Sequence, residues 1–487
     1  MEVLSLGVKH IPYMLSFCAL FLGMVAPDRT LFFLSGVPNL IVASFLFAFA
    51  ALIMFIFVKP RFLNARNCSL KQIMQKLAPY APILIFCAFN IIFVAIAYLN
   101  LNIIGEGSSL RPLRWWVDFF MLQISILCAL YIGAKTARCG NRTLGTVMFI
   151  ALCVMAVLSV GEYYYLSGYA NQVGQWIRAI NLDSPVHVWI WQDFEPVRAQ
   201  GLARSPSLYA FTALIFVVWA LSAKKMLLLR YSGLVIAIMI VYLSGTRSAF
   251  VALAFVLLVY LLKRVTDGGF ISQLRNQIRY LIPAAAILLI LVGGTYYVTG
   301  MNNISRNVAI AEVLNSGDGE LAEEQELAVY QISADYETDT MIQEPSYSFW
   351  YQISSGRTEV WRETITQIKN HPWGMWVTSD SAISWSHTHN DILERLITAG
   401  VVSLFLYLLL LWWLAFRVKS YQAPLFPLLL SALLLSFGLF EVVFAQIAFA
   451  PPAFYLLGYL SNPDGGTCTS GGQVQSEQQS VVHLDKT

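Results

Sequence analysis

Long apolar runs separated by short polar segments fill most of the chain up to about residue 460. A helix needs roughly 20 apolar residues to cross the hydrocarbon core of a bilayer. Twelve segments approach this length and are the predicted spans: 11–27, 37–58, 80–100, 115–134, 144–165, 206–222, 227–243, 248–262, 280–299, 396–416, 424–440 and 443–460. The pattern predicts an all-α polytopic membrane protein.

Composition supports this class, since 57% of the residues are hydrophobic and 12% are charged, about half the charge of an average soluble chain. The net charge of +3 gives no indication of nucleic-acid binding. Lys and Arg concentrate in alternate connections, above all in 59–79 and 263–279. The positive-inside rule assigns these connections, and both termini, to the cytoplasm.

One connection is long enough to form an extramembrane domain. We expect nine spans in 1–299, with an exported loop at 165–205, and an exported loop domain at 300–395 between spans nine and ten. The last three spans occupy 396–461, and a disordered cytoplasmic tail rich in Gly, Ser and Gln follows at 462–487. Within the loop domain, the sequence RTEVWRETITQIKN has apolar residues at helical spacing, which predicts a short amphipathic helix at the membrane surface.

Three arginines on the exported side run against the positive-inside bias. Arg198 precedes span six, Arg247 lies in a tight turn between two spans, and Arg357 opens the amphipathic helix. An Arg at a membrane boundary needs an anionic partner or a water-filled cavity, although it can also reach to lipid headgroups. Arg357 adds the free amides and positive dipole of a helix N-terminus, so this position suits a phosphate.

Two histidines precede span ten in the sequence SHTHNDILERLITAG. His387 and His389 could ligate zinc, but no third ligand falls at a usual spacing. We therefore expect no metal. Imidazole titrates near neutral pH, and His389 suits a general base that takes a proton from a hydroxyl.

These segments together resemble the O-antigen ligase and polymerase superfamily of bacterial envelope glycosyltransferases. The C-terminal core of that family has a Ser/Thr-Arg turn, then an Arg with a Trp four residues on and a Pro-x-Gly, then His-Asn, nine residues and Gly-x-x-Gly. The corresponding segments here are SGTRSAF, GRTEVWRETITQIKNHPWG and HNDILERLITAG, over roughly 196–420. Ser403 replaces the second Gly of the last motif.

The resemblance implies transfer of a glycan from an undecaprenyl-diphosphate carrier to an acceptor hydroxyl at the periplasmic face of the inner membrane. The acceptor would be lipid A-core in a ligase, or another carrier-linked repeat in a polymerase. His389 would be the catalytic base, and substrate would bind at Arg247, Arg357, Arg198, His387 and Asn390. No cofactor is expected, and the partners would be the lipid-linked donor, the acceptor and membrane lipid.

Two other classes of protein fit parts of the pattern. A transporter of lipid-linked sugars would also need exported arginines, but it would tolerate a change at His389 better than a catalyst would. A cell-wall glycan polymerase of the shape and division type would rely on a loop carboxylate, so Asp391 or Glu394 would then matter most.

Overall fold

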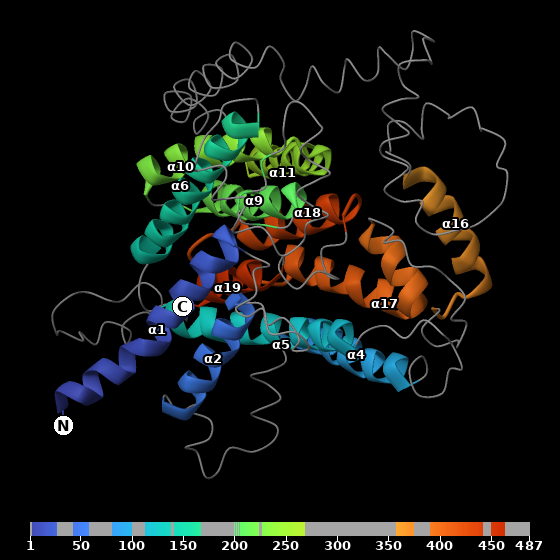
Figure 1. Ribbon diagram of the computed structural model, residues 1–487, viewed down its shortest axis with the longest axis horizontal. Coiled ribbons are helices and arrows are strands. Elements are labelled where there is room, and N and C mark those ends of the chain that lie inside the picture. Colours follow the sequence, from blue (N-terminus) through green and yellow to red (C-terminus); the bar gives the residue numbers. More distant parts are fainter. Residues whose placement is uncertain are drawn as a thin grey trace, which may run out of the picture.

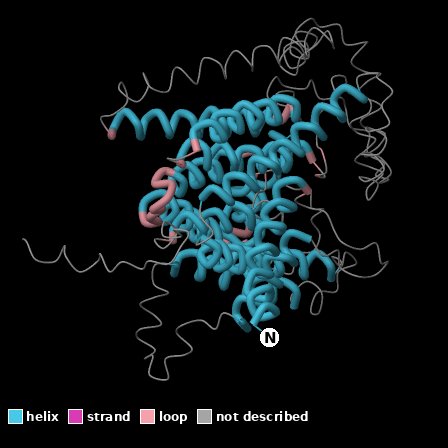
Figure 2. Tube along the Cα trace, turned by 90° about the vertical axis from the view of Figure 1, so that its left-hand side faces the viewer, coloured by secondary structure: helices cyan, strands magenta, loops and turns pink. Residues whose placement is uncertain are grey.

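The computed structural model contains helices and no strands in the part of the chain that it describes (Figures 1 and 2). That part comprises residues 2–26, 42–57, 80–99, 113–137, 141–166, 199, 201, 203, 205–223, 226–267, 357–374, 390–441 and 450–462. Its helices are α1 (Glu2–Val25), α2 (Val42–Phe57), α4 (Ala81–Tyr98), α5 (Leu113–Thr136), α6 (Asn141–Leu166), α9 (Pro206–Ser222), α10 (Leu227–Ser244), α11 (Arg247–Thr266), α16 (Arg357–Asn370), α17 (Asp391–Phe416), α18 (Phe426–Gly438) and α19 (Ala450–Ser461).

The helices confirm that apolar runs form α-helices, because each predicted span that falls within the described residues overlaps one of them. The predicted span 280–299 lies outside the described residues. Four helices, α6, α10, α11 and α17, are long and apolar enough to cross a membrane, and shorter apolar helices accompany them. The described part of this membrane protein is therefore all-helical, and the count of twelve spans stays a prediction.

Helix α9 is the centre of the bundle. Ser205 caps its first turn by accepting a hydrogen bond from Leu208 N at 3.2 Å, and Pro206 occupies the first helical position, where no amide is needed. Nearly all of its side chains are buried, as expected for a helix that is apolar on every face. It packs against α10, α18, α11 and α1.

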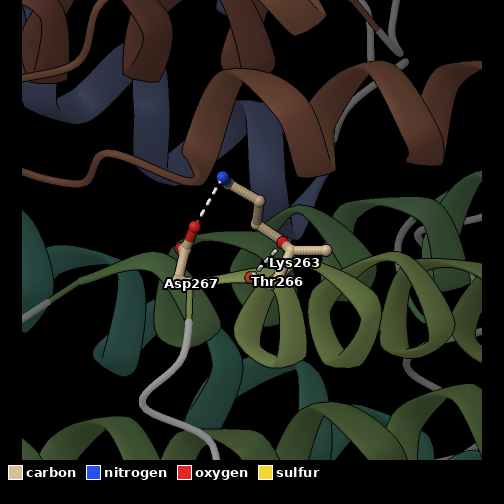
Figure 3. A network of polar contacts seen from close by, with 3 residues as sticks. All are labelled: Lys263, Thr266 and Asp267. Carbon is tan, nitrogen blue, oxygen red and sulfur yellow. Dashed lines mark hydrogen bonds and ion pairs between the residues drawn. The ribbon is translucent and has the colours of Figure 1, made fainter.

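Helix α11 shows the surface of a membrane helix. Its exposed side is a stripe of large apolar residues at helical spacing: Val251, Phe255, Leu258 and Leu262. The opposite side is buried and includes the small residues Ser248, Ala249 and Ala252. Large apolar groups outside and small groups inside are the arrangement that lipid-facing helices adopt. At the far end of α11, Lys263 Nζ donates to Asp267 Oδ1 at 2.7 Å, and both side chains are exposed (Figure 3).

Glycines allow the closest helix contact, between α5 and α19. A Cβ atom at Gly133 would overlap the carbonyl of Tyr455, and one at Gly458 would overlap the carbonyl of Leu130. The hydroxyls of Thr136 and Tyr455 lie 2.9 Å apart across the same interface. Backbones can approach so closely only where side chains are absent, so these glycines fix how α19 sits on α5.

Candidate functional site

The turn between α10 and α11 forms as the sequence predicts. Gly245 ends α10 with a positive φ of 57°, a conformation that glycine adopts without strain. Arg247 is the first residue of α11 and its side chain is exposed. Arg247 therefore stands at a helix N-terminus, which adds a positive dipole end to its own charge.

The segment before α9 lies against this same turn. Ala199 N donates to Leu243 O at 2.9 Å, two residues before the turn begins. Arg198 itself lies outside the described residues, but it precedes Ala199 directly in the sequence. The structure thus brings the backbone next to Arg198 to the turn that carries Arg247, although the two arginines are far apart in the chain.

Helix α16 confirms the predicted amphipathic helix, with the predicted limits of Arg357 and Asn370. Figure 1 shows it at the edge of the bundle, beside α17. It packs against α17, and in the turn that follows it Pro372 O accepts a hydrogen bond from Val401 N at 3.1 Å. Arg357 begins the other end of the helix, and its side chain lies outside the described residues.

The main feature that the sequence did not reveal is a break inside α17 at Gly400. Gly400 has φ 70° and ψ −167°, a region open to glycine alone. A Cβ there would overlap the backbone of Trp373, and a Cβ at Gly374 would lie 2.6 Å from Gly400 N. Two motif glycines therefore pack backbone against backbone, and the predicted span 396–416 is in fact part of two helical arms, 391–399 and 401–416.

The two arms of α17 fold back on each other. Arg395 Nη1 lies 3.4 Å from Ser403 Oγ, and its guanidinium carbon lies 4.8 Å from the centre of the Tyr407 ring. In one straight helix residues 395 and 407 would be roughly 18 Å apart at 1.5 Å per residue. The break thus turns α17 into a helical hairpin, which Figure 1 shows as two arms that meet at an angle.

Asn390 ties the start of this hairpin to the end of α18. Its Oδ1 accepts from Ile392 N at 2.9 Å and from Leu393 N at 3.1 Å, so Asn390 is the N-cap of α17. Its Nδ2 donates to Leu439 O at 3.0 Å. Asn390 was predicted to bind substrate. In the structure its side-chain oxygen caps α17 and its side-chain nitrogen bonds to the end of α18.

The end of α18 joins several helices, and we call Ser207, Asn390, Leu439 and Glu441 the α18 junction. Ser207 Oγ, in the first turn of α9, donates to Glu441 Oε1 at 2.9 Å. Ser207 is only a short way along the chain from Ala199, which is bound at the α10–α11 turn. The α18 junction and the Arg247 turn therefore lie at the same end of the bundle.

Three charged side chains just inside the hairpin are buried: Asp391, Glu394 and Arg395 have relative exposures of 1%, 6% and 6%. The sequence analysis considered both acids only as the loop carboxylates that a cell-wall glycan polymerase would use. The signal that could have located them is their i, i+3, i+4 spacing at the start of an apolar helix. Because they are buried, these three side chains are not part of a solvent-exposed helix face. They belong to the packed structure that supports the candidate site.

His387 and His389 lie outside the described residues, so their placement stays a prediction. The described residues contain no group of three His, Cys, Asp or Glu side chains that could hold a metal ion. What the structure does fix is the residue after His389: Asn390 is buried at the α18 junction.

The fold and the junction define a helical membrane protein with polar groups gathered at one end of its bundle. Residues 232–408 match the model of a protein family described as O-Antigen ligase. The match covers Arg247, α16 and the break at Gly400, and it confirms the resemblance drawn from the three motifs. It supports the broad class of a glycosyltransferase of the O-antigen ligase or polymerase type in lipopolysaccharide biosynthesis. No curated protein matches this chain.

Proposed function

We propose that this protein is an O-antigen ligase of the bacterial inner membrane. It moves a glycan from an undecaprenyl-diphosphate carrier to a hydroxyl of lipid A-core on the periplasmic side. The observation that carries the proposal is the family match over residues 232–408, which contains all three motifs in order. The structure supports it by gathering the Arg247 turn and the start of α17 at one end of the bundle.

The donor would be held through its diphosphate. Arg247 and Arg357 each begin a helix, so each combines a guanidinium with a helix N-terminus. The planar guanidinium pairs with two phosphate oxygens at once. Arg198 would be a third contact, because the backbone that follows it is bound beside the Arg247 turn. These cations stabilise the charge that collects on the leaving diphosphate.

The acceptor would be activated by His389. Its imidazole takes the proton from the acceptor hydroxyl as that oxygen bonds to the anomeric carbon. The bond between this carbon and the diphosphate oxygen breaks at the same time, and undecaprenyl diphosphate leaves with the electron pair. Asn390 fixes the backbone that follows His389, and His387 contributes to sugar binding. The proposed reaction uses no metal ion and no cofactor.

Lipopolysaccharide gels of a deletion strain test the function. A ligase predicts that the whole O-antigen ladder disappears while carrier-linked polymer accumulates, and that the wild-type chain restores the ladder. Loss of all bands beyond a single repeat would instead identify a polymerase, and an unchanged ladder would contradict both.

Variants with Lys in place of Arg247 and Arg357 test the diphosphate contacts. Lysine keeps the charge but loses the two-pronged pairing, so we expect transfer to fall in each variant. An Arg362→Lys variant on the exposed face of α16 is the control. Wild-type activity in both Arg247→Lys and Arg357→Lys would remove these residues from donor binding.

Sidedness needs a separate test, since the proposal places the loop domain 300–395 in the periplasm and the tail 462–487 in the cytoplasm. Reporter fusions after Glu320 and after Ser470 should report opposite sides of the membrane. The same side for both fusions would overturn this topology.

A further inference from the structure

Arg395 is held by aromatic rings from two helices. Its guanidinium carbon lies 4.9 Å from the ring centre of Phe86 on α4 and 4.8 Å from that of Tyr407 on the second arm of α17. The side chain is 6% exposed. A cation over an aromatic face is attracted by the electrons of the ring, so this one side chain links the first arm of α17 to two other segments.

Two carboxylates accompany Arg395 on the same arm. Asp391 is four residues and Glu394 one residue before it, and both side chains are buried. A Cβ built at Gly438 would lie 3.1 Å from both Asp391 Oδ2 and the Tyr407 hydroxyl oxygen. The first arm of α17, its second arm and the end of α18 therefore meet around these charges.

A cluster of this kind is a poor way to gain stability alone. Removing ionic groups from water is costly, and well-packed apolar side chains often stabilise such a position equally well. The neighbours of Arg395 in the sequence show that apolar residues suit this arm, because Ile392, Leu393, Leu396 and Ile397 surround it. In some proteins a buried ionic group instead selects one arrangement of packed segments over others.

We propose that Arg395 is a positioning residue that sets the angle between the two arms of α17 and so holds Asn390, the residue that follows His389 in the sequence, at the α18 junction. This role rests on the proposed function, because it assigns Arg395 to the reaction through His389. His389 is joined to Asn390 by one peptide bond, and Asn390 is the cap of the arm that Arg395 holds. The residue acts on geometry and does not touch the substrate.

Steady-state kinetics separate positioning from folding. Arg395→Leu is expected to insert and purify like the wild type, with kcat lowered about a hundredfold, since a misplacement near 1 Å has that effect, and with the donor KM changed by less than about twofold. The kcat of Arg395→Lys should lie between those of the wild type and Arg395→Leu, because an ammonium group cannot lie flat against both rings.

Arg417→Leu is the matched control, because Arg417 also stacks on a ring of α17, that of Trp412 at 5.3 Å, but is exposed at the other end of the helix. It should keep the wild-type kcat. An unchanged kcat in Arg395→Leu would overturn the proposal. So would a loss explained entirely by a smaller amount of folded protein.

A cross-link tests the arm without any activity measurement. The Cβ of Asp391 lies 3.3 Å from the Cβ position of Gly438, close to the separation of roughly 3.8 Å in disulfides. Asp391→Cys with Gly438→Cys should form a disulfide, detected by mass spectrometry of the linked peptides, and adding Arg395→Leu should lower its yield. An equal yield would show that Arg395 does not hold the arm, even if His389 proved to be the base. If the wild type did not catalyse the proposed transfer but Arg395→Leu still lowered the disulfide yield, the proposed function would be wrong. The role of Arg395 in holding the arm would still stand.

Discussion

Two sets of charged side chains in this protein have the same i, i+4 spacing and opposite surroundings. Lys263 and Asp267 pair at the end of α11 with side chains 43% and 45% exposed (Figure 3). Asp391 and Arg395 lie at the start of α17 and are 1% and 6% exposed. Spacing by itself stabilises such a helical pair by about 0.3–0.5 kcal/mol at the surface.

Burial changes what the same spacing means. Asp391 and Arg395 are shielded from water, so salt screens their charges much less than it screens the exposed pair. We therefore expect substitutions in the first set to have little effect. The second set constrains the α17 hairpin, which begins two residues after the proposed catalytic histidine. The predictions below sharpen this contrast between the α18 junction and the exposed end of α11.

The largest effect is expected on transfer when His389 is replaced by Ala. General-base action contributes about a hundred- to ten-thousandfold in rate, so product should fall by that factor while membrane insertion stays intact. The measurement is turnover of a carrier-linked donor by purified protein. His371→Ala, in the turn after α16, is the control and should stay active.

The same assay tests the absence of a metal. Activity that survives EDTA in the wild type agrees with His389 acting alone as the base. Inhibition by EDTA that a divalent ion reverses would falsify the metal-free part of the proposal.

The largest effect on stability is expected for Gly400→Ala. The backbone conformation at this position costs a residue with a side chain about 1–3 kcal/mol, and the new Cβ would also overlap the backbone of Trp373. We expect a lower melting temperature and loss of transfer. Gly145→Ala is the control, because a Cβ there meets only the ends of the Met226 and Trp219 side chains. Equal melting temperatures for Gly400→Ala and Gly145→Ala would argue against a backbone conformation at residue 400 that only glycine can adopt.

Asn390→Ala should have a smaller effect, since loss of an N-cap costs about 1 kcal/mol of stability. Asn390→Ser keeps a good cap but is too short to reach Leu439 O, so it separates the two bonds of the side chain. If only the cap matters, the serine variant will match the wild type in thermal unfolding and in transfer. If the bond to α18 matters, the serine variant will resemble the alanine variant in transfer.

Lys263→Ala is expected to change least, by at most about 0.5 kcal/mol, because the pair is exposed to solvent and salt. Thermal unfolding with and without added salt measures the difference. A large destabilisation would show that exposure does not explain the contrast between the two sets of charges.

The sequence by itself determined where helices form. Long apolar runs located α9, α10 and α11 to within a few residues, and helical spacing of apolar residues in RTEVWRETITQIKN located α16. These features depend on side chains close in the chain, which explains why local patterns predict them. The Ser-Gly-Thr-Arg turn is also local, because a glycine with positive φ is enough to end α10.

Only the tertiary structure decided that α17 is a hairpin. An apolar run through Gly400 is compatible with one straight helix, and the break depends on contact with Pro372–Gly374, which lie in another segment. Burial of Asp391 and Arg395 follows from that fold-back, since Tyr407 and Gly438 reach them only when the two arms meet. Contacts between residues distant in the chain leave no periodic pattern in the sequence. For this physical reason only the tertiary structure revealed the packing around the candidate site.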